Sequence, residues 1–120
     1  MKNQIENIIN WNKIAGNNDF NKHLEASMLS EEFAETIIAI KNKDKIEVLD
    51  WVCDMLIIWV WTLHKLWFRS EQISKAMDLI MDNNYSKFQY DEKWSHICIK
   101  DENWKILKPE WFTPVDLSYL

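Results

Sequence analysis

The sequence has few of the residues that interrupt helices, since only one of its 120 residues is glycine and two are proline. Such a composition favours long helices joined by short connections. The two cysteines, Cys53 and Cys98, have neither a CxxC nor a Cys/His zinc spacing. A reduced, cytoplasmic setting is therefore expected, and the first ten residues contain no apolar segment of a signal peptide.

Positive charge is also scarce, because arginine occurs once and the formal net charge is −5. Without a cluster of lysine and arginine, nucleic acid is not expected as a partner. No membrane partner is expected either, because the strongest apolar run, residues 55–68, is too short to span a bilayer and contains His64 and Lys65. An acidic protein can still bind a phosphate compound through intervening metal ions.

What the sequence does contain is 48% apolar residues and eight tryptophans, which together predict a globular fold. Capping signals and apolar periodicity indicate four helices. Their expected ranges are residues 5–16 with Gly16 as the stop, about 21–42, about 45–66 after a capping box formed by Asp44 and Glu47, and 71–84 after a Ser70 cap.

After residue 87 the pattern changes. Residues 94–108 alternate and contain a turn at 101–103, which predicts a short hairpin, and the tail from residue 109 holds both prolines and is expected to be extended. We therefore expect an all-α four-helix bundle in a single domain, residues 1–120. Its helical core covers about residues 1–87, and a C-terminal appendage covers about 88–120.

Acidic residues interrupt the apolar stripes of the second and third predicted helices. In the second helix, the spacing of a buried seam places on one face Leu24, Met28, Glu31, Glu35 and Ile38, with Glu32 at its border. In the third helix, one face carries Glu47, Asp50 and Asp54, followed by Ile58 and Trp61. If the two helices pack as antiparallel neighbours, these carboxylates face each other near the connected end.

Like charges held this close and partly desolvated cannot all stay ionised without compensation. Arginine and lysine are absent from both groups, so a divalent cation is the remedy, and oxygen-only ligands favour Mg²⁺ or Mn²⁺. A di-iron site is not expected, because its Glu-x-x-His pairs do not occur. A simpler interpretation stays open, since acidic residues on helices are often solvated and capping alone explains Glu47.

Four stretches, in this order, resemble the MazG-like superfamily of all-α nucleoside triphosphate pyrophosphohydrolases over roughly residues 24–117. They are EExxE at 31–35, DxxxD at 50–54, DNNYSKF at 82–88 and DENWKILKPEWFTPVDL at 101–117. The resemblance implies a four-helix protomer that assembles into a homodimer or a dimer of dimers. It also implies Mg²⁺-dependent hydrolysis of (d)NTPs to the monophosphate and pyrophosphate, in nucleotide-pool control or house-cleaning.

The resemblance also implies roles for individual residues. By position, Glu32, Glu35 and Asp54 match metal ligands, and Asp50 matches the acidic residue of phage-type members. The positions that match substrate-contacting residues are Asn84, Lys87, Lys105 and Lys108. A carboxylate that is not used in coordination is the candidate catalytic base, and Glu31 and Glu47 both remain open for this role.

Trp51 stands where the commonest family pattern has a glutamate, so a second function stays open. The chain would then be a non-catalytic helical module that senses nucleotides or binds a partner. The tryptophan-rich face, Trp51, Trp59, Trp61 and Trp67, is interpreted as core and subunit interface rather than as a base-stacking platform. His64 is interpreted as a packed residue, and an obligate oligomer is expected because one protomer can hardly bury eight tryptophans.

Overall fold

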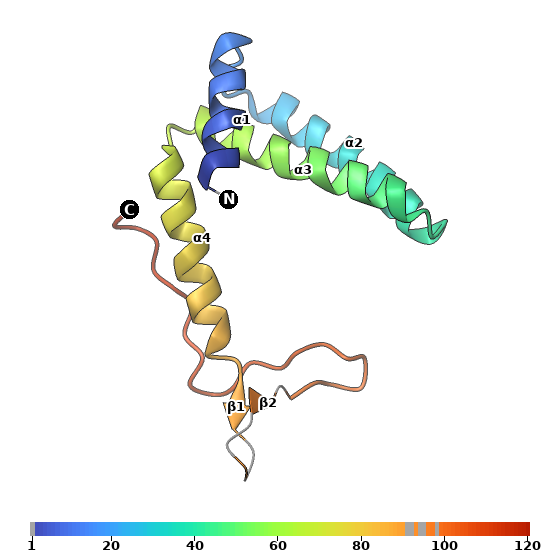
Figure 1. Ribbon diagram of the computed structural model, residues 1–120, viewed down its shortest axis with the longest axis vertical. Helices are drawn as coiled ribbons and strands as arrows, with labels where there is room; N and C mark the ends of the chain where they lie inside the picture. The colour runs from blue at the N-terminus through green and yellow to red at the C-terminus, as the bar shows by residue number, and fades with distance from the viewer. Residues whose placement is uncertain (1, 91–92, 94–95, 98) are drawn as a thin grey trace. The chain divides into compact units, whose positions relative to one another are not determined.

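The computed structural model describes residues 2–90, 93, 96–97 and 99–120. Within these residues the chain forms four helices and two short strands (Figure 1). The elements are α1 (Lys2–Ile14), α2 (Lys22–Lys41), α3 (Lys45–Lys65), α4 (Ser70–Tyr85), β1 (Gln89–Tyr90) and β2 (His96–Ile97). The predicted all-α class with four helices is therefore confirmed.

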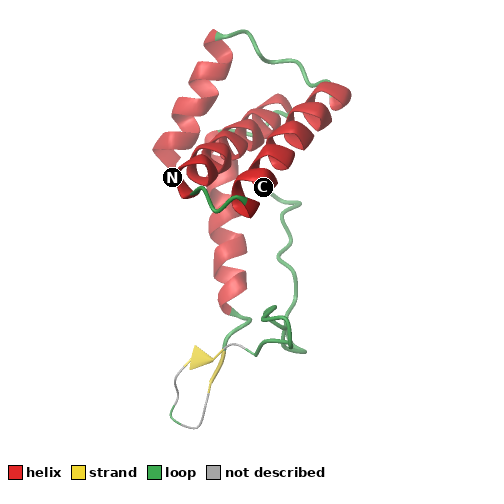
Figure 2. Cartoon of the chain, turned by 90° about the vertical axis from the view of Figure 1, so that its right-hand side faces the viewer, coloured by secondary structure: helices red, strands yellow, loops and turns green. Residues whose placement is uncertain are grey.

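The chain divides into two compact units, one through Ile73 and the other from Ser74 onward. The predicted border between core and appendage, at about residue 87, falls inside the second unit. Figure 2 shows that the chain after α4 is mostly loop, whereas the first unit is mostly helical. No helix in the described ranges combines the length and the apolar character needed to cross a membrane.

Local capping chemistry explains where α2 and α3 begin. The Asn21 side chain accepts hydrogen bonds from the backbone N–H groups of His23 and Leu24, each at 3.1 Å. Asp44 Oδ1 accepts the N–H of Glu47 at 3.2 Å, which is one half of the predicted capping box. The other half is replaced, because the Asp44 N–H donates to the Ala39 carbonyl at 3.2 Å.

The predicted Ser70 cap of the fourth helix is wrong. Ser70 is the first residue of α4, and Arg69 occupies the capping position before it. The Arg69 N–H donates to Gln72 Oε1 at 2.9 Å, and the Arg69 carbonyl accepts the N–H of Ile73 at 3.0 Å. The error arose because serine is the better cap by composition, whereas the glutamine three residues after Arg69 determines the register.

The core of the first unit lies where α1 packs against α3. Its buried residues are Ile5, Ile9, Val60 and Ile73, with Ile8 and Leu63 packed against them. Trp11 of α1 stacks on Trp61 of α3, with ring centroids 5.2 Å apart and an angle of 12° between the rings. Helix α1 ends as predicted, because Gly16 adopts the left-handed conformation (φ 71°) that glycine favours after a helix.

The second unit contains the two strands and a second antiparallel contact. Strand β1 pairs with β2 through Gln89–Ile97 and Tyr90–His96. The predicted hairpin over residues 94–108 includes Trp94, Ser95 and Cys98, which lie outside the described residues. In its described part, Lys100 and Ile106 form an antiparallel bridge around a turn, in which Asp101 Oδ1 accepts the N–H groups of Asn103 and Lys105.

Candidate functional site

Helices α2 and α3 are antiparallel neighbours joined by the three residues Asn42–Asp44. The predicted seam of α2, from Leu24 to Ile38, is wrong by about one residue, since Leu24 and Ile38 are 49% and 59% exposed. The residues of α2 that are buried are Glu25, Thr36 and Ala39. Apolar residues lie on several faces of α2, so the apolar spacing alone points to the wrong stripe.

Glu32 consequently lies closer to the buried side of α2 than Glu31, which is exposed. The Thr36 hydroxyl donates to the Glu32 carbonyl at 2.8 Å and lies 3.3 Å from Met55 Sδ of α3. Among the described residues, Glu32 Oε2 is buried without a hydrogen-bond partner. A buried carboxylate oxygen in this state carries an uncompensated desolvation penalty.

The pKa of Glu32 is raised above its ordinary value, first by desolvation and then by neighbouring negative charge. The contributing carboxylates come from both helices and are Glu35, Asp54, Glu31 and Asp50. With Glu32, these five residues are called the carboxylate cluster below. Acidic residues of α2 and α3 therefore lie close enough to Glu32 to act on its pKa.

Glu47 stands apart from the carboxylate cluster. It is exposed in the first turn of α3, where its N–H bonds to Asp44, and it is not among the charges that raise the Glu32 pKa. That bond shows Asp44 capping α3, but the Glu47 carboxylate does not complete the capping box, because the Asp44 N–H donates to the Ala39 carbonyl. Of the two candidate bases, only Glu31 lies close enough to act electrostatically on Glu32.

The carboxylate cluster offers only oxygen donors, which is the ligand type that Mg²⁺ and Mn²⁺ prefer. The orphaned Glu32 oxygen and the mutual repulsion around it both fit a bound cation. In the described ranges, however, no three His, Cys, Asp or Glu side chains are already gathered to hold a metal ion. The donor chemistry fits a divalent cation, and binding would have to draw the side chains together.

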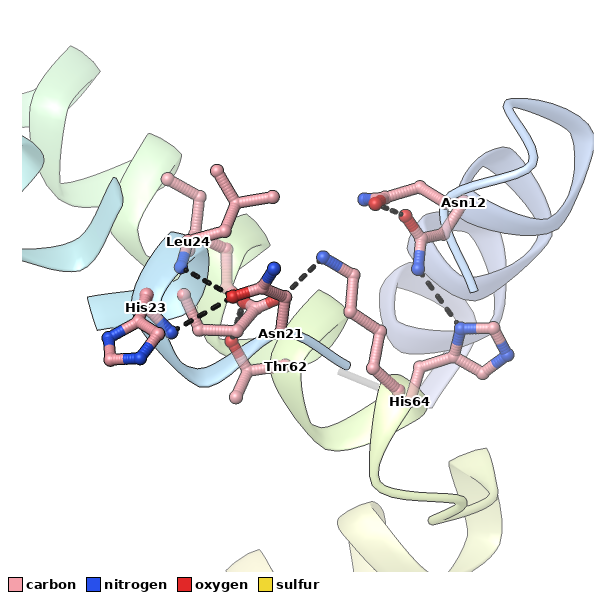
Figure 3. A network of polar contacts seen from close by, with 10 residues as sticks. Asn12, Asn21, His23, Leu24, Thr62 and His64 are labelled. Carbon is pink, nitrogen blue, oxygen red and sulfur yellow. Dashed lines mark hydrogen bonds and ion pairs between the residues drawn. The ribbon is translucent and has the colours of Figure 1, made fainter. Parts of the chain in front are cut away.

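A second carboxylate of α2 has the compensation that Glu32 lacks. Glu25 is 3% exposed and forms an ion pair with the buried Lys65 of α3. Thr62 Oγ1 donates to the other carboxylate oxygen of Glu25 at 2.8 Å, as Figure 3 shows near the label of Thr62. This buried pair was not anticipated, although a lysine within an apolar run was the available signal.

His64 is held by a buried amide network at the end of α3 (Figure 3). The side chain of Asn17 donates to Asn12 Oδ1 at 2.7 Å, and Asn12 Nδ2 lies 3.0 Å from His64 Nδ1. Because an amide nitrogen only donates, Nδ1 is the acceptor and Nε2 carries the proton of the neutral ring. The pKa of His64 is lowered, first by desolvation and then by Lys13 and Lys65, which supports the neutral form.

The four residues matched to substrate contacts all belong to the second unit. Lys87 and Lys108 place their ammonium groups 5.2 and 5.3 Å from the centroid of the Phe112 ring. Asn84 is half-buried at the end of α4, where its carbonyl accepts the N–H of Lys87 at 3.1 Å. Lys105 is exposed, and its backbone belongs to the Asp101 turn.

The predicted tryptophan face separates into packed and exposed residues. Trp61 stacks on α1, and its Nε1 is buried without a partner among the described residues. Trp51 is half-buried, whereas Trp59 and Trp67 are 48% and 87% exposed. The prediction that these tryptophans belong to the core therefore holds for Trp61, whereas Trp59 and Trp67 are not part of the core of this chain.

The chain's own residues carry the functional argument, because the comparisons with known proteins add no relative to it. No family model matches the chain, and no curated protein and no solved structure matches it either.

Proposed function

We propose that the protein is a Mg²⁺-dependent nucleotide pyrophosphohydrolase with a MazG-like helical fold, which converts (d)NTP to (d)NMP and pyrophosphate. The observation that carries this proposal is the carboxylate cluster, in which Glu32 Oε2 is buried without a partner and surrounded by negative charge. A carboxylate oxygen that is removed from water without a partner is destabilised unless a proton or a counter-charge is supplied. A divalent cation supplies it and at the same time binds the phosphates of the substrate.

Glu32, Glu35, Asp50 and Asp54 are the residues that would hold Mg²⁺, with Mn²⁺ as a possible substitute. When bound, the ion neutralises phosphate charge and lowers the pKa of a coordinated water. Glu31 is the candidate for accepting the proton of the attacking water, because it is the exposed member of the carboxylate cluster next to Glu32 and is not one of the four proposed metal ligands. Water adds to phosphorus, the proton passes to the carboxylate, and pyrophosphate leaves.

The substrate contacts proposed for the second unit follow the chemistry of its side chains. Lys87, Lys105 and Lys108 provide ammonium groups, which bind phosphate oxygens. Asn84 provides both a donor and an acceptor for a base or sugar edge. Glu47 remains the alternative base, and it is the weaker candidate because it is not among the charges that raise the pKa of Glu32.

A homodimer or a dimer of dimers is part of the same proposal. Large apolar side chains remain exposed along both α2 and α3, and exposed apolar surface of this kind marks interaction sites. They include Phe33, Ile38, Ile40, Ile46, Leu49, Leu56 and Trp59. A second copy of the chain would remove them from water. Light scattering at micromolar concentration tests this point, and a monomer would contradict it.

A non-catalytic nucleotide-sensing or partner-binding module is the second candidate. It is favoured by the lack of a ready-made metal group among the described side chains and by Trp51, which occupies a position where a further carboxylate would complete the cluster. Such a module would bind nucleotide without turnover.

Pyrophosphate release separates the two candidates. The purified chain is incubated with each of the common ribo- and deoxyribonucleoside triphosphates, with Mg²⁺ or with EDTA. The hydrolase predicts equimolar monophosphate and pyrophosphate with at least one substrate, in Mg²⁺ only. Binding of a triphosphate without any pyrophosphate release would favour the sensing module, and release of inorganic phosphate instead of pyrophosphate would contradict the proposed reaction.

A further inference from the structure

A cavity of about 510 Å³ lies in the first unit between α1, the C-terminal end of α3 and the first turn of α4. This volume falls within the range of pockets that bind small molecules, roughly 300–1,000 Å³. His64 lines it and is ten residues from Asp54 on α3, so the two lie about 15 Å apart along the helix. The cavity is therefore separate from the carboxylate cluster.

Charged and polar groups converge on this cavity. Lys13 and Arg69 provide cations, and Glu6 and Glu71 provide carboxylate oxygens. The Arg69–Glu71 pair is 3.9 Å apart and well exposed, so it holds neither side chain firmly. His64 contributes a donor, because its Nδ1 is occupied by Asn12 and its Nε2 carries the proton.

An aromatic side chain stands at the cavity in a costly backbone conformation. Trp67 has φ 71°, the left-handed region that bulky residues avoid, yet its side chain is 87% exposed. It ends α3 in a Schellman arrangement, with its N–H donating to the His64 carbonyl at 2.9 Å and the Phe68 N–H to the Leu63 carbonyl at 3.1 Å. Glycine is the usual residue there.

Neither packing nor backbone preference accounts for Trp67. A side chain this exposed buries little apolar surface, and the left-handed conformation costs on the order of 1–2 kcal/mol for a residue with a Cβ. Strain of this kind is typically retained where it positions a group for function. An exposed indole ring at the edge of a cavity is suited to stacking on a planar ligand.

We infer that the cavity is a second ligand site, which binds a nucleoside monophosphate. The base stacks on Trp67 and accepts a hydrogen bond from His64 Nε2–H. The phosphate lies against the cations Lys13 and Arg69, and the ribose hydroxyls donate to the oxygens of Glu6 and Glu71. A mononucleotide uses the ring, the cations and the carboxylates together, whereas inorganic phosphate leaves the ring and the carboxylates unused.

This inference does not rest on the proposed hydrolase activity, and its test is run without metal. The four common ribonucleoside 5′-monophosphates, the parent nucleosides and inorganic phosphate are titrated into the wild-type chain in EDTA and followed by calorimetry. Saturable binding of at least one monophosphate, stronger than its nucleoside and stronger than phosphate, is the expected result. An absence of saturable binding by every monophosphate would overturn the inference.

The variant Trp67→Gly tests whether the indole ring stacks on the base, and Trp104→Gly is the matched control. Both tryptophans are highly exposed at positive φ, at 87% and 78%, but Trp104 belongs to the second unit and does not line the cavity. Both changes relieve backbone strain, so neither is expected to lower the melting temperature. Trp67→Gly should weaken monophosphate binding about tenfold or more, whereas Trp104→Gly should not change it. Equal binding by Trp67→Gly and wild type would contradict the assignment.

Lys13→Gln with Lys41→Gln as control tests the phosphate contact. Both lysines are exposed in the last turn of their helices, and only Lys13 lines the cavity. Lys13→Gln should weaken the monophosphate and reduce the salt dependence of binding while leaving the nucleoside unaffected. Asp54→Asn should leave monophosphate binding in EDTA unchanged. Loss of binding in Asp54→Asn but not in Lys13→Gln would move the ligand to the carboxylate cluster and overturn the second site.

Discussion

Glu25 and Glu32 lie two turns apart on α2, and both lie on the side that faces α3, but only the charge of Glu25 is compensated by other residues of the chain. Glu25 is buried with Lys65 and Thr62 around its two oxygens. Glu32 has one buried oxygen without a partner among the described residues, and the charges that act on its pKa are all negative. The same helix pair thus supplies a cation where a carboxylate serves structure. Under the proposed function, the counter-charge that α2 and α3 do not provide at Glu32 would come from a bound divalent cation.

The largest expected effect is a loss of stability when the ion pair between Glu25 and Lys65 is broken. Glu25→Gln leaves the Lys65 ammonium buried without its counter-charge, which should lower the free energy of unfolding by about 3–5 kcal/mol. Glu32→Gln is the matched control on the same helix and should not destabilise the metal-free protein. Urea unfolding of both variants measures the difference.

A double variant sharpens this prediction. Glu25→Met with Lys65→Met replaces both charges by apolar side chains, so no buried charge is left alone. Most of the stability lost in Glu25→Gln should return. If the double variant is as unstable as the single one, packing around Glu25 matters more than the ion pair.

The next largest effect is expected on the rate of pyrophosphate release when the carboxylate cluster loses one negative charge. Asp54→Asn removes one negative ligand from the carboxylate cluster while keeping size and hydrogen-bonding capacity. Pyrophosphate release should fall by a factor of about a hundred or more, which corresponds to roughly 2.7 kcal/mol in the barrier. Steady-state assays in Mg²⁺ provide the measurement. Turnover close to that of the wild type would remove Asp54 from the proposed site.

Metal binding should stabilise the protein by a smaller amount. Mg²⁺ at roughly ten to a hundred times its Kd is expected to add about 1.4–2.7 kcal/mol to the free energy of unfolding, because it binds only the folded carboxylate cluster. Thermal melting with Mg²⁺ and with EDTA measures the shift. The shift should persist in Glu25→Asp and disappear in Glu32→Gln. A melting temperature that ignores Mg²⁺ would contradict a metal site.

The smallest effect is a pH dependence caused by Glu32. Its pKa is raised from 4.5 in the folded state, so the folded protein holds this proton at a pH where the unfolded chain has lost it. Without metal, the contribution of this proton to stability is fully present below pH 4.5 and is lost as the pH rises through the folded pKa. Urea unfolding across this range should show that Glu32→Gln loses this part of the slope. An identical slope in both proteins would mean that Glu32 is not perturbed.

Helix ends were the most predictable part of the fold, because caps are local chemistry. The second helix was expected at about residues 21–42 and runs from Lys22 to Lys41 behind the Asn21 cap. Gly16 ends α1 through its positive φ, as its position in the sequence indicated. The exception is the start of α4, where Ser70 is a favourable capping residue but Gln72 accepts the N–H of Arg69 and places the cap one residue earlier.

Side-chain environment was less predictable, since it depends on which faces meet. The short connection and the shared helix faces correctly predicted that acidic residues of α2 and α3 lie near each other. The buried face of α2, however, lies about one residue further along the chain than the apolar spacing predicted. Small buried residues, Thr36 and Ala39, set the contact with α3, while larger apolar neighbours remain exposed. The Glu25–Lys65 pair and the cavity beside Trp67 depend on contacts between residues that are distant in sequence, which no local pattern encodes.

The three-residue connection between α2 and α3 also has a kinetic consequence. Lys43 takes a positive φ of 54° in it, and the connection places the acidic residues of the two helices only about twenty residues apart in the chain. Because closing a short loop costs less entropy than closing a long one, we expect these contacts to form before α1 packs against α3. The repulsion within the carboxylate cluster should therefore already be present in the transition state for folding. It should lower the folding rate more than it raises the unfolding rate.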